Sequence, residues 1–208
     1  MVFTPINMGQ RERKEYFEQF YSNVPTTFSI TVNLDISNLR NKSLKLYPAM
    51  LYLLARLVNK HEEFRTMFDD DGILGFFDIV HPAYTIFHKE TETFSGIWSE
   101  YDPDFETFCR NYNSDVNKYG NIMKYEAKPN CPPNIFYVSM LPWLHFSSFN
   151  LNLKQGYDYL MPIFTMGKYI EENGKTILPF SVLAHHAVCD GWHVSKFINE
   201  LQQNIDNL

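Results

Sequence analysis

Hydrophobic and polar positions alternate along this chain with two different periods. In residues 47–61 apolar side chains recur three and four positions apart, which is the spacing of an amphipathic helix. Residues 28–37 instead alternate apolar and polar side chains, which is typical of a strand. The same criteria predict further helices at residues 11–22, 104–120 and 192–208. They predict short β-structures within residues 72–79, 83–101, 134–141, 159–170 and 176–188.

The order of these elements favours an α/β fold built as a two-layer sandwich. Strands come in pairs and groups between a few helices, which predicts a mixed β-sheet covered by helices on one side rather than a doubly wound parallel sheet. Several strand candidates are apolar at both alternations, so they should lie mid-sheet with both faces covered, by helices or by another subunit. Residues 127–134 contain three prolines and predict a loop. This loop is too short for a domain boundary, so we expect residues 1–208 to form one domain.

Composition and charge narrow the class of protein. Hydrophobic residues make up 45% of the chain and aromatic residues 16%, which argues against disorder. With 18 basic and 24 acidic residues the net charge is -6, and the chain lacks the basic stripe of a nucleic-acid-binding protein. A local basic spot could still hold an anionic cosubstrate. Because the sequence shows neither a signal peptide nor a membrane-spanning stretch, we expect a cytoplasmic protein without a membrane partner.

The stretch HHAVCDGWH, residues 185–193, concentrates the candidate chemistry. As a zinc site it would need three or four converging ligands, and His185 and His186 face opposite sides if a strand continues through them. No HExxH-like spacing supports a metal, so none is expected. As a nucleophile, Cys189 would need a neighbour that stabilises its thiolate, and a buried thiol is the commoner state. The three cysteines, Cys109, Cys131 and Cys189, are odd in number and without CxxC pairs, which predicts free thiols.

A third interpretation makes His186 a general base, followed four residues later by Asp190 and Gly191. Gly191 would let the chain turn sharply into the last helix. Asp190 would cap that helix or pair with a cation, and so would hold the turn that carries the histidine. The alternative is that Asp190 is only an N-cap and His186 a core histidine. The spacing alone supports both interpretations equally.

The stretch HHAVCDG resembles the HHxxxDG motif of the chloramphenicol acetyltransferases. LYPAMLYLLARLVN, TIFHKETETFSGIWSEY, VSMLPWLHFSSFNLN, PIFTMGKY and GWHVSKFINELQQ resemble that family too, in the same order from about residue 10 to the C-terminus. HxxxDG by itself is shared with the wider group of coenzyme A-dependent acyltransferases, whereas TETFS and SFNLN are similar to the chloramphenicol enzymes specifically. The resemblance implies the coenzyme A-dependent acyltransferase fold.

The resemblance also implies an activity, the acetyl-CoA-dependent acetylation of the 3-hydroxyl of chloramphenicol by direct transfer in a ternary complex. His186 would be the general base, and an imidazole with an ordinary pKa of roughly 6.5 is available as a neutral ring near neutral pH. Ser139 would donate a hydrogen bond to the tetrahedral oxyanion, and Thr165 would contact the intermediate through water. Asp190 would pair with Arg13 and order the site.

The family resemblance further implies the binding residues and the assembly. Trp143 and Tyr169 would lie near coenzyme A, and a homotrimer would place His186 from one subunit beside most of the drug pocket of its neighbour. Two alternatives are an acyltransferase for another hydroxyl acceptor and a binding protein without turnover. Binding alone requires neither a base nor an oxyanion donor, which argues against the latter. The resemblance implies that the walls of the drug pocket are Phe20, Val24, Phe94, Phe149 and Leu151. Each of these residues, taken alone, would also suit an ordinary hydrophobic core.

Overall fold

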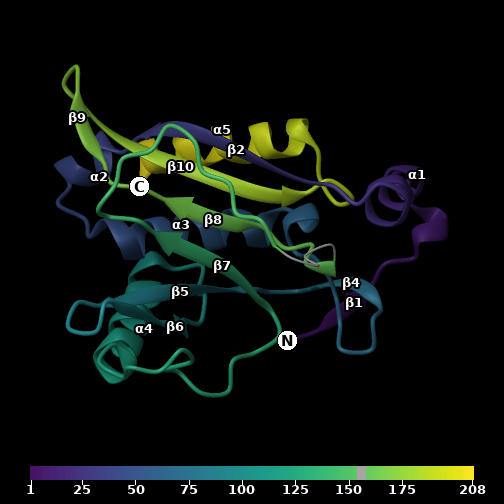
Figure 1. The fold of residues 1–208 in the computed structure, drawn as a ribbon, viewed down its shortest axis with the longest axis horizontal. Helices are drawn as coiled ribbons and strands as arrows, with labels where there is room; N and C mark the ends of the chain where they lie inside the picture. The colour runs from purple at the N-terminus through teal and green to yellow at the C-terminus, as the bar shows by residue number, and fades with distance from the viewer. Residues whose placement is uncertain (154–157) are drawn as a thin grey trace.

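The computed structural model describes residues 1–153 and 158–208 (Figure 1). Within them a seven-stranded sheet has the order β2-β10-β8-β7-β5-β6, and β9 pairs with β10. Because β7 runs parallel to both β5 and β8 while the other pairs are antiparallel, the predicted mixed sheet is confirmed. Its strands are β2 (Thr27–Asp35), β5 (His81–His88), β6 (Thr93–Trp98), β7 (Ile135–Met140), β8 (Ile163–Met166), β9 (Ile170–Glu172) and β10 (Lys175–His185).

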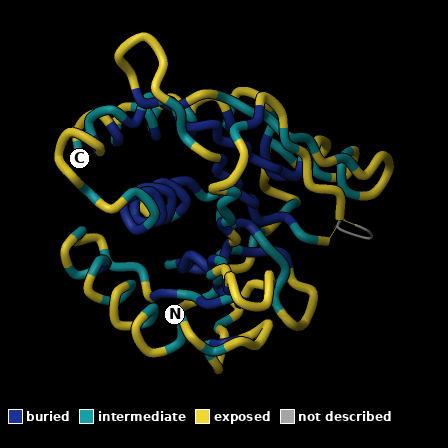
Figure 2. The backbone as a smooth tube through the Cα atoms, turned by 60° about the vertical axis from the view of Figure 1, so that its left-hand side comes forward, coloured by how far each residue is buried: buried dark blue, intermediate teal, exposed yellow. Residues whose placement is uncertain are grey.

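The helices cover one face of this sheet. The longest are α3 (Leu46–Lys60), α4 (Phe105–Tyr119) and α5 (Gly191–Asn207), at the positions that the periodicity predicts. Helix α3 packs against both of the others and is buried along most of its length (Figure 2). Stacked rings join the layers, since the centroid of Phe164 on β8 lies 5.7 Å from that of Phe180 and 5.3 Å from that of Phe197 on α5.

Short elements complete the fold, and all of them except β4 (Leu74–Phe77), which lies within the predicted residues 72–79, were not predicted. Strands β1 (Phe3–Pro5) and β3 (Thr66–Phe68) flank β4 in a small antiparallel sheet. Helix α2 (Ser37–Asn41) follows β2, and two 3₁₀ turns cover residues 8–10 and 62–64. Each of these elements has three to five residues, which is too few for a hydrophobic period to emerge.

The short helix predicted at residues 11–22 is confirmed only in part, since its bounds and its type differ. Helix α1 spans only Lys14–Phe17, and a π-helical segment follows over Glu18–Asn23. Its closing bond runs from the N–H of Val24 to the carbonyl of Gln19, five residues back. A π-turn inserts one residue into the helical repeat, which changes the direction of the side chains after it. Phe20, inside this segment, is thereby turned toward the end of β10.

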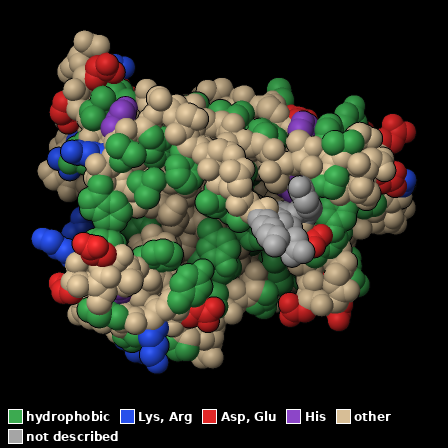
Figure 3. Space-filling view, in the orientation of Figure 1, with side chains coloured by type: hydrophobic (Ala, Val, Ile, Leu, Met, Phe, Trp, Pro, Cys, Tyr) green, Lys and Arg blue, Asp and Glu red, His purple; other side chains and the backbone are tan. Residues whose placement is uncertain are grey.

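The face of the sheet opposite the helices is open and largely apolar. In β7 the side chains of Phe136 and Val138 are buried toward the helices, so Ile135, Tyr137 and Ser139 face the other way. Tyr137 is 47% exposed, although tyrosine is a large side chain that sheets usually cover. Figure 3 shows hydrophobic side chains gathered around a hollow on this face. An apolar surface of this kind commonly marks a contact with a ligand or another subunit.

Candidate active site

The stretch of residues 185–193 leaves the sheet and turns into α5. Strand β10 ends at His185, and His186 is already part of the turn, where its N–H donates to the carbonyl of Thr26 at 2.9 Å. The N–H groups of Val188 and Cys189 both donate to the carbonyl of His185 at 3.2 Å. The strand therefore does not continue through both histidines. His185 is 1% exposed and its Nδ1 accepts from the N–H of Ala187, so it supports the turn from inside.

The imidazole of His186 lies against two aromatic rings. The ring of Phe20 is stacked on it, with centroids 3.9 Å apart and an angle of 12° between the planes. Phe28 of β2 approaches from another side, with centroids 5.2 Å apart. The π-turn therefore places Phe20 directly on the candidate base. This packing limits rotation of the partly buried imidazole, because the ring cannot turn without displacing its neighbours.

Asp190 performs both of the roles considered for it. One carboxylate oxygen, Oδ1, accepts from the N–H groups of Trp192 at 3.0 Å and His193 at 3.4 Å, which caps α5. The other, Oδ2, accepts from Nη1 of Arg13 at 2.9 Å. Nδ1 of His193 also lies 2.9 Å from Oδ1. The carboxylate thus ties the turn to the N-terminal segment of the chain.

The expectation that Gly191 is needed for a sharp turn is wrong. Its φ is not among the positive values, and an added Cβ would meet no atom within 4 Å among the described residues. Gly191 is the first residue of α5, where any residue with helical dihedrals fits. The cap by Asp190 makes the change of direction instead.

Asp190 is expected to stabilise the fold at neutral pH. Burial raises the pKa of its carboxyl, but hydrogen bonds from Arg13 and His193 outweigh burial and lower that pKa to about 2. Since the folded pKa lies below the unfolded value of roughly 3.9, this stability is present above the unfolded pKa and is lost as the pH falls through the folded one. We expect Asp190→Asn to lower the free energy of unfolding at pH 7 by about 1 kcal/mol, a modest figure because the carboxylate is partly solvent-screened.

Urea unfolding at pH 7, 4 and 2 measures this effect. The difference between the wild-type protein and Asp190→Asn should shrink between pH 4 and pH 2, where the Asp190 carboxyl of the wild-type protein becomes protonated and loses its charge, as the amide of the variant never carries one. Asp158→Asn is a suitable control, since the side-chain oxygen of asparagine can still accept the hydrogen bond from the hydroxyl of Tyr21. A loss of the same size for Asp190→Asn at pH 2 and pH 7 would contradict the ionic role.

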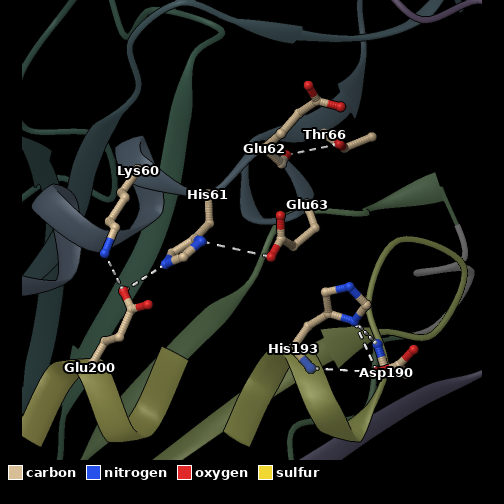
Figure 4. A network of polar contacts seen from close by, with 8 residues as sticks. All are labelled: Lys60, His61, Glu62, Glu63, Thr66, Asp190, His193 and Glu200. Atoms are coloured by element: carbon tan, nitrogen blue, oxygen red, sulfur yellow. Dashed lines mark hydrogen bonds and ion pairs between the residues drawn. The ribbon is translucent and has the colours of Figure 1, made fainter. Parts of the chain in front are cut away.

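A second polar network holds α5 in place (Figure 4). Nζ of Lys60 and Nε2 of His61 each lie 2.8 Å from Oε2 of Glu200 on α5. Burial raises the pKa of Glu200, but these two partners outweigh it and lower that pKa. The C-terminal end of α3 is thereby fixed to the helix that Asp190 caps. Sequence reasoning missed these residues, because nothing in the spacing of three ordinary polar residues indicates that they meet.

Ser139 and Thr165 lie side by side on the open face of the sheet. They are opposite each other on β7 and β8, and their hydroxyl oxygens are 3.1 Å apart. Ser139 lines a cavity of about 480 Å³, whose walls also include Phe94 and Leu151. A hydroxyl at the edge of an apolar hollow is well placed to donate to a bound substrate.

Three of the implied drug-pocket residues lie outside this cavity. Phe20 stacks on His186, as described above, and Val24 is 55% exposed at the end of the same π-helical segment. Phe149 is held over β2 and β10, because its N–H donates to Oγ1 of Thr31 and its carbonyl accepts from Oγ of Ser181. The implied pocket therefore falls into two groups within one chain.

His186 and Ser139 of one chain are far apart. Ser139 is level with Ser181 of β10, two strands away, and His186 is five residues farther along. At roughly 4.8 Å per strand and 3.3 Å per residue, the two residues are on the order of 20 Å apart. Figure 1 shows the same geometry, since the arrowheads of β7 and β8 point away from the end of β10. His186 and Ser139 of the same chain therefore cannot both contact one reacting group.

The two residues implied for coenzyme A lie near the far ends of β7 and β8. Trp143 is 59% exposed, and its ring meets that of Phe87 with centroids 4.5 Å apart. Tyr169 lies beneath the guanidinium of Arg40, 5.0 Å from the ring centroid. A backbone hydrogen bond from Lys168 to Leu144 joins the two loops that carry these rings. Trp143 offers a solvent-facing ring surface, whereas Tyr169 is already partly covered.

The other candidates in residues 185–193 are packed or supporting side chains. Cys189 is 1% exposed, which confirms the expected buried cysteine, and this burial raises the pKa of its thiol. The three cysteines are free. In residues 1–153 and 158–208 we find no group of three or more histidine, cysteine, aspartate or glutamate side chains that could hold a metal ion. Among the described helices, none is both long and apolar enough to cross a membrane.

Comparisons with known proteins give one consistent result. A profile of the chloramphenicol acetyltransferase family matches residues 1–202. A chloramphenicol acetyltransferase of Clostridium perfringens is 54% identical over 207 residues, covering 100% of both chains. One of Vibrio anguillarum is 51% identical, covering 100% of this chain and 96% of the relative. Among solved structures, a chloramphenicol acetyltransferase superposes with a TM-score of 0.84 at 24% identity, covering 97% of this chain and 99% of the other. The dihydrolipoamide acetyltransferase of Azotobacter vinelandii gives a TM-score of 0.66 at 15% identity, covering 99% and 91%.

Proposed function

The chain belongs to the chloramphenicol acetyltransferase family, and from that membership we propose that it acetylates the 3-hydroxyl of chloramphenicol with acetyl-CoA. In the acetylated product the 3-hydroxyl is blocked, so the activity confers resistance to chloramphenicol. The observation that carries this proposal is the 54% identity to a chloramphenicol acetyltransferase along its whole length. Acetyl-CoA is a cytoplasmic metabolite, so we infer that the protein acts in the cytoplasm.

His186 is the general base of this reaction. Its neutral imidazole takes the proton of the 3-hydroxyl while the hydroxyl oxygen attacks the thioester carbonyl of acetyl-CoA. The new C–O bond gives a tetrahedral intermediate, which collapses as the C–S bond breaks and the imidazolium returns the proton to the sulfur. No acyl-enzyme is formed. Phe20 supports this role because the face of an aromatic ring favours the positive charge that the imidazole carries during transfer.

Ser139 stabilises the oxyanion of the intermediate, and Thr165 contacts the intermediate through water. We expect Ser139→Ala to reduce kcat by about a hundred- to a thousandfold, because a donor to the oxyanion acts only after the carbonyl has been attacked. KM for both substrates should change by less than about threefold. Thr165→Val is the matched comparison, since it removes the neighbouring hydroxyl and keeps the shape. If Thr165→Val costs as much as Ser139→Ala, Ser139 is not the direct donor.

The assembly that supports this chemistry is a homotrimer with active sites between subunits. His186 and Ser139 of one chain are on the order of 20 Å apart, so they can serve one reaction only if they come from different copies. The open apolar face around Ser139 offers a surface for the neighbouring copy. We place His186 of one subunit over the cavity of the next, with coenzyme A reaching Ser139 from the end that carries Trp143 and Tyr169.

A coupled assay tests the activity itself. The protein is mixed with acetyl-CoA and chloramphenicol, and the release of coenzyme A thiol is followed with a chromogenic reagent. We expect release that depends on both substrates. Release with another alcohol but not with chloramphenicol would favour an acyltransferase for a different acceptor. Binding of chloramphenicol without release would favour a binding protein.

A further inference from the structure

A second cavity borders the cavity beside Ser139. The first has about 480 Å³ and the second about 340 Å³. They share four lining residues, which are Cys131, Ile135, Tyr137 and Tyr159. The boundary between the two cavities is therefore formed by these side chains. Tyr159 stands beside Tyr137 there, with ring centroids 5.8 Å apart.

The register of β7 gives the position of the second cavity relative to Ser139. Ile135, Tyr137 and Ser139 face the same side, and alternate residues of a strand lie roughly 6.6 Å apart. The boundary between the cavities consequently lies roughly 7–13 Å from Ser139. Ser139 marks the end where acetyl transfer takes place under the proposed function. An acceptor whose reacting hydroxyl lies at Ser139 and which follows β7 extends its opposite end toward Tyr159.

The hydroxyl of Tyr159 is a buried donor. It is shielded from solvent and has no hydrogen-bond partner among the residues that the structure describes. Burial raises the pKa of Tyr159 well above its ordinary value, so the hydroxyl keeps its proton and can donate. The ammonium of Lys128, which also lines the first cavity, is already bound by Asp115 at 2.7 Å and by the carbonyl of Trp98 at 3.0 Å. A buried polar group without a partner is unfavourable for folding and is typical of binding sites.

We propose that Tyr159 is a specificity-determining residue whose hydroxyl donates a hydrogen bond to the para-nitro group of chloramphenicol, at the end remote from the reacting hydroxyl. This inference rests on the proposed function. It assigns a polar contact to the part of the acceptor that the apolar walls alone would not distinguish from an unsubstituted phenyl ring.

Tyr159→Phe tests the inference with two acceptors, chloramphenicol and its analogue with hydrogen in place of the nitro group. For chloramphenicol we expect KM to rise about three- to tenfold with kcat within about twofold, because one hydrogen bond of the bound substrate is lost. For the analogue neither constant should change. The midpoint of thermal unfolding should stay the same or rise, because the substitution removes an unpaired buried hydroxyl. Tyr52→Phe is the control, since the Tyr52 hydroxyl donates to the carbonyl of Pro103 at 2.8 Å away from both cavities. It should lower the midpoint and leave KM unchanged.

Three results would overturn the inference. They are equal increases in KM for both acceptors, no change in KM for either, and a fall in the unfolding midpoint of Tyr159→Phe as large as that of Tyr52→Phe. Calorimetric titration of chloramphenicol into the two proteins measures the same discrimination without turnover. If the wild-type protein releases no thiol, the proposed function fails. The ratio of the two dissociation constants then still decides whether Tyr159 binds the nitro group.

Discussion

Replacing His186 with alanine is expected to reduce kcat by about a hundred- to a ten-thousandfold, which is the range of general acid–base catalysis. The substitution should lower kcat and change KM little, because the imidazole holds the proton of the substrate hydroxyl only during acetyl transfer. Thiol release from acetyl-CoA at saturating concentrations of both substrates measures it. A pH profile adds a second readout, since the kcat limb that reports the ionisation of the base should disappear in the variant.

The neighbouring histidine provides the matched control. His185→Ala is expected to keep much of the turnover, but it also removes the acceptor for the N–H of Ala187 and so destabilises the turn. His185→Asn is therefore the better variant, because its side-chain oxygen can still accept a hydrogen bond. Far-ultraviolet circular dichroism and unfolding midpoints show whether both variants fold. Comparable losses of kcat in folded His185→Asn and His186→Ala would contradict the assignment of the base.

The parts of the fold that could be predicted from the sequence are those with a long period. Helices α3 and α5 are amphipathic over several turns, and the edge strand β2 alternates apolar and polar positions as a half-covered strand does. Strand β10 is apolar at both alternations and lies between two other strands, as expected for a strand covered on both faces. The π-helical segment at Glu18–Asn23 could not be foreseen, because its sequence pattern is that of an ordinary helix.

The candidate site, like the fold, could be predicted from the sequence only in part. The HHxxxDG motif indicated His186 and Asp190 as candidates, and the resemblance added Ser139 and Arg13. Of the contacts expected within one chain, the structure shows the pairing of Arg13 with Asp190. What the sequence could not predict is which of these residues meet within one chain. That depends on the register of β7, β8 and β10, which sets Ser139 level with Ser181 and leaves His186 beyond the other end of the sheet. Cross-strand register is decided by packing and not by the spacing of residues along the sequence.

The separation of His186 and Ser139 makes a prediction about mixed assemblies. His186→Ala and Ser139→Ala are each expected to be nearly inactive. If every active site combines His186 of one subunit with Ser139 of the next, a trimer that contains both variants has some sites with both residues intact. For random assembly of equal amounts, half of the subunits supply an intact histidine and half an intact serine, so about one quarter of the wild-type activity should return. The two variants are unfolded together, refolded by dilution and assayed for thiol release.

A second mixture separates the two arrangements of the site. The double variant with both substitutions is refolded with an equal amount of wild-type protein. A site shared between subunits again needs two intact neighbours and retains about one quarter of the activity, whereas a site within one chain retains about one half. Mixing the folded single variants without unfolding should restore nothing, because their subunits have not exchanged. No activity from the first mixture together with half from the second would show that His186 and Ser139 act within one chain, and the proposed trimeric site would be wrong.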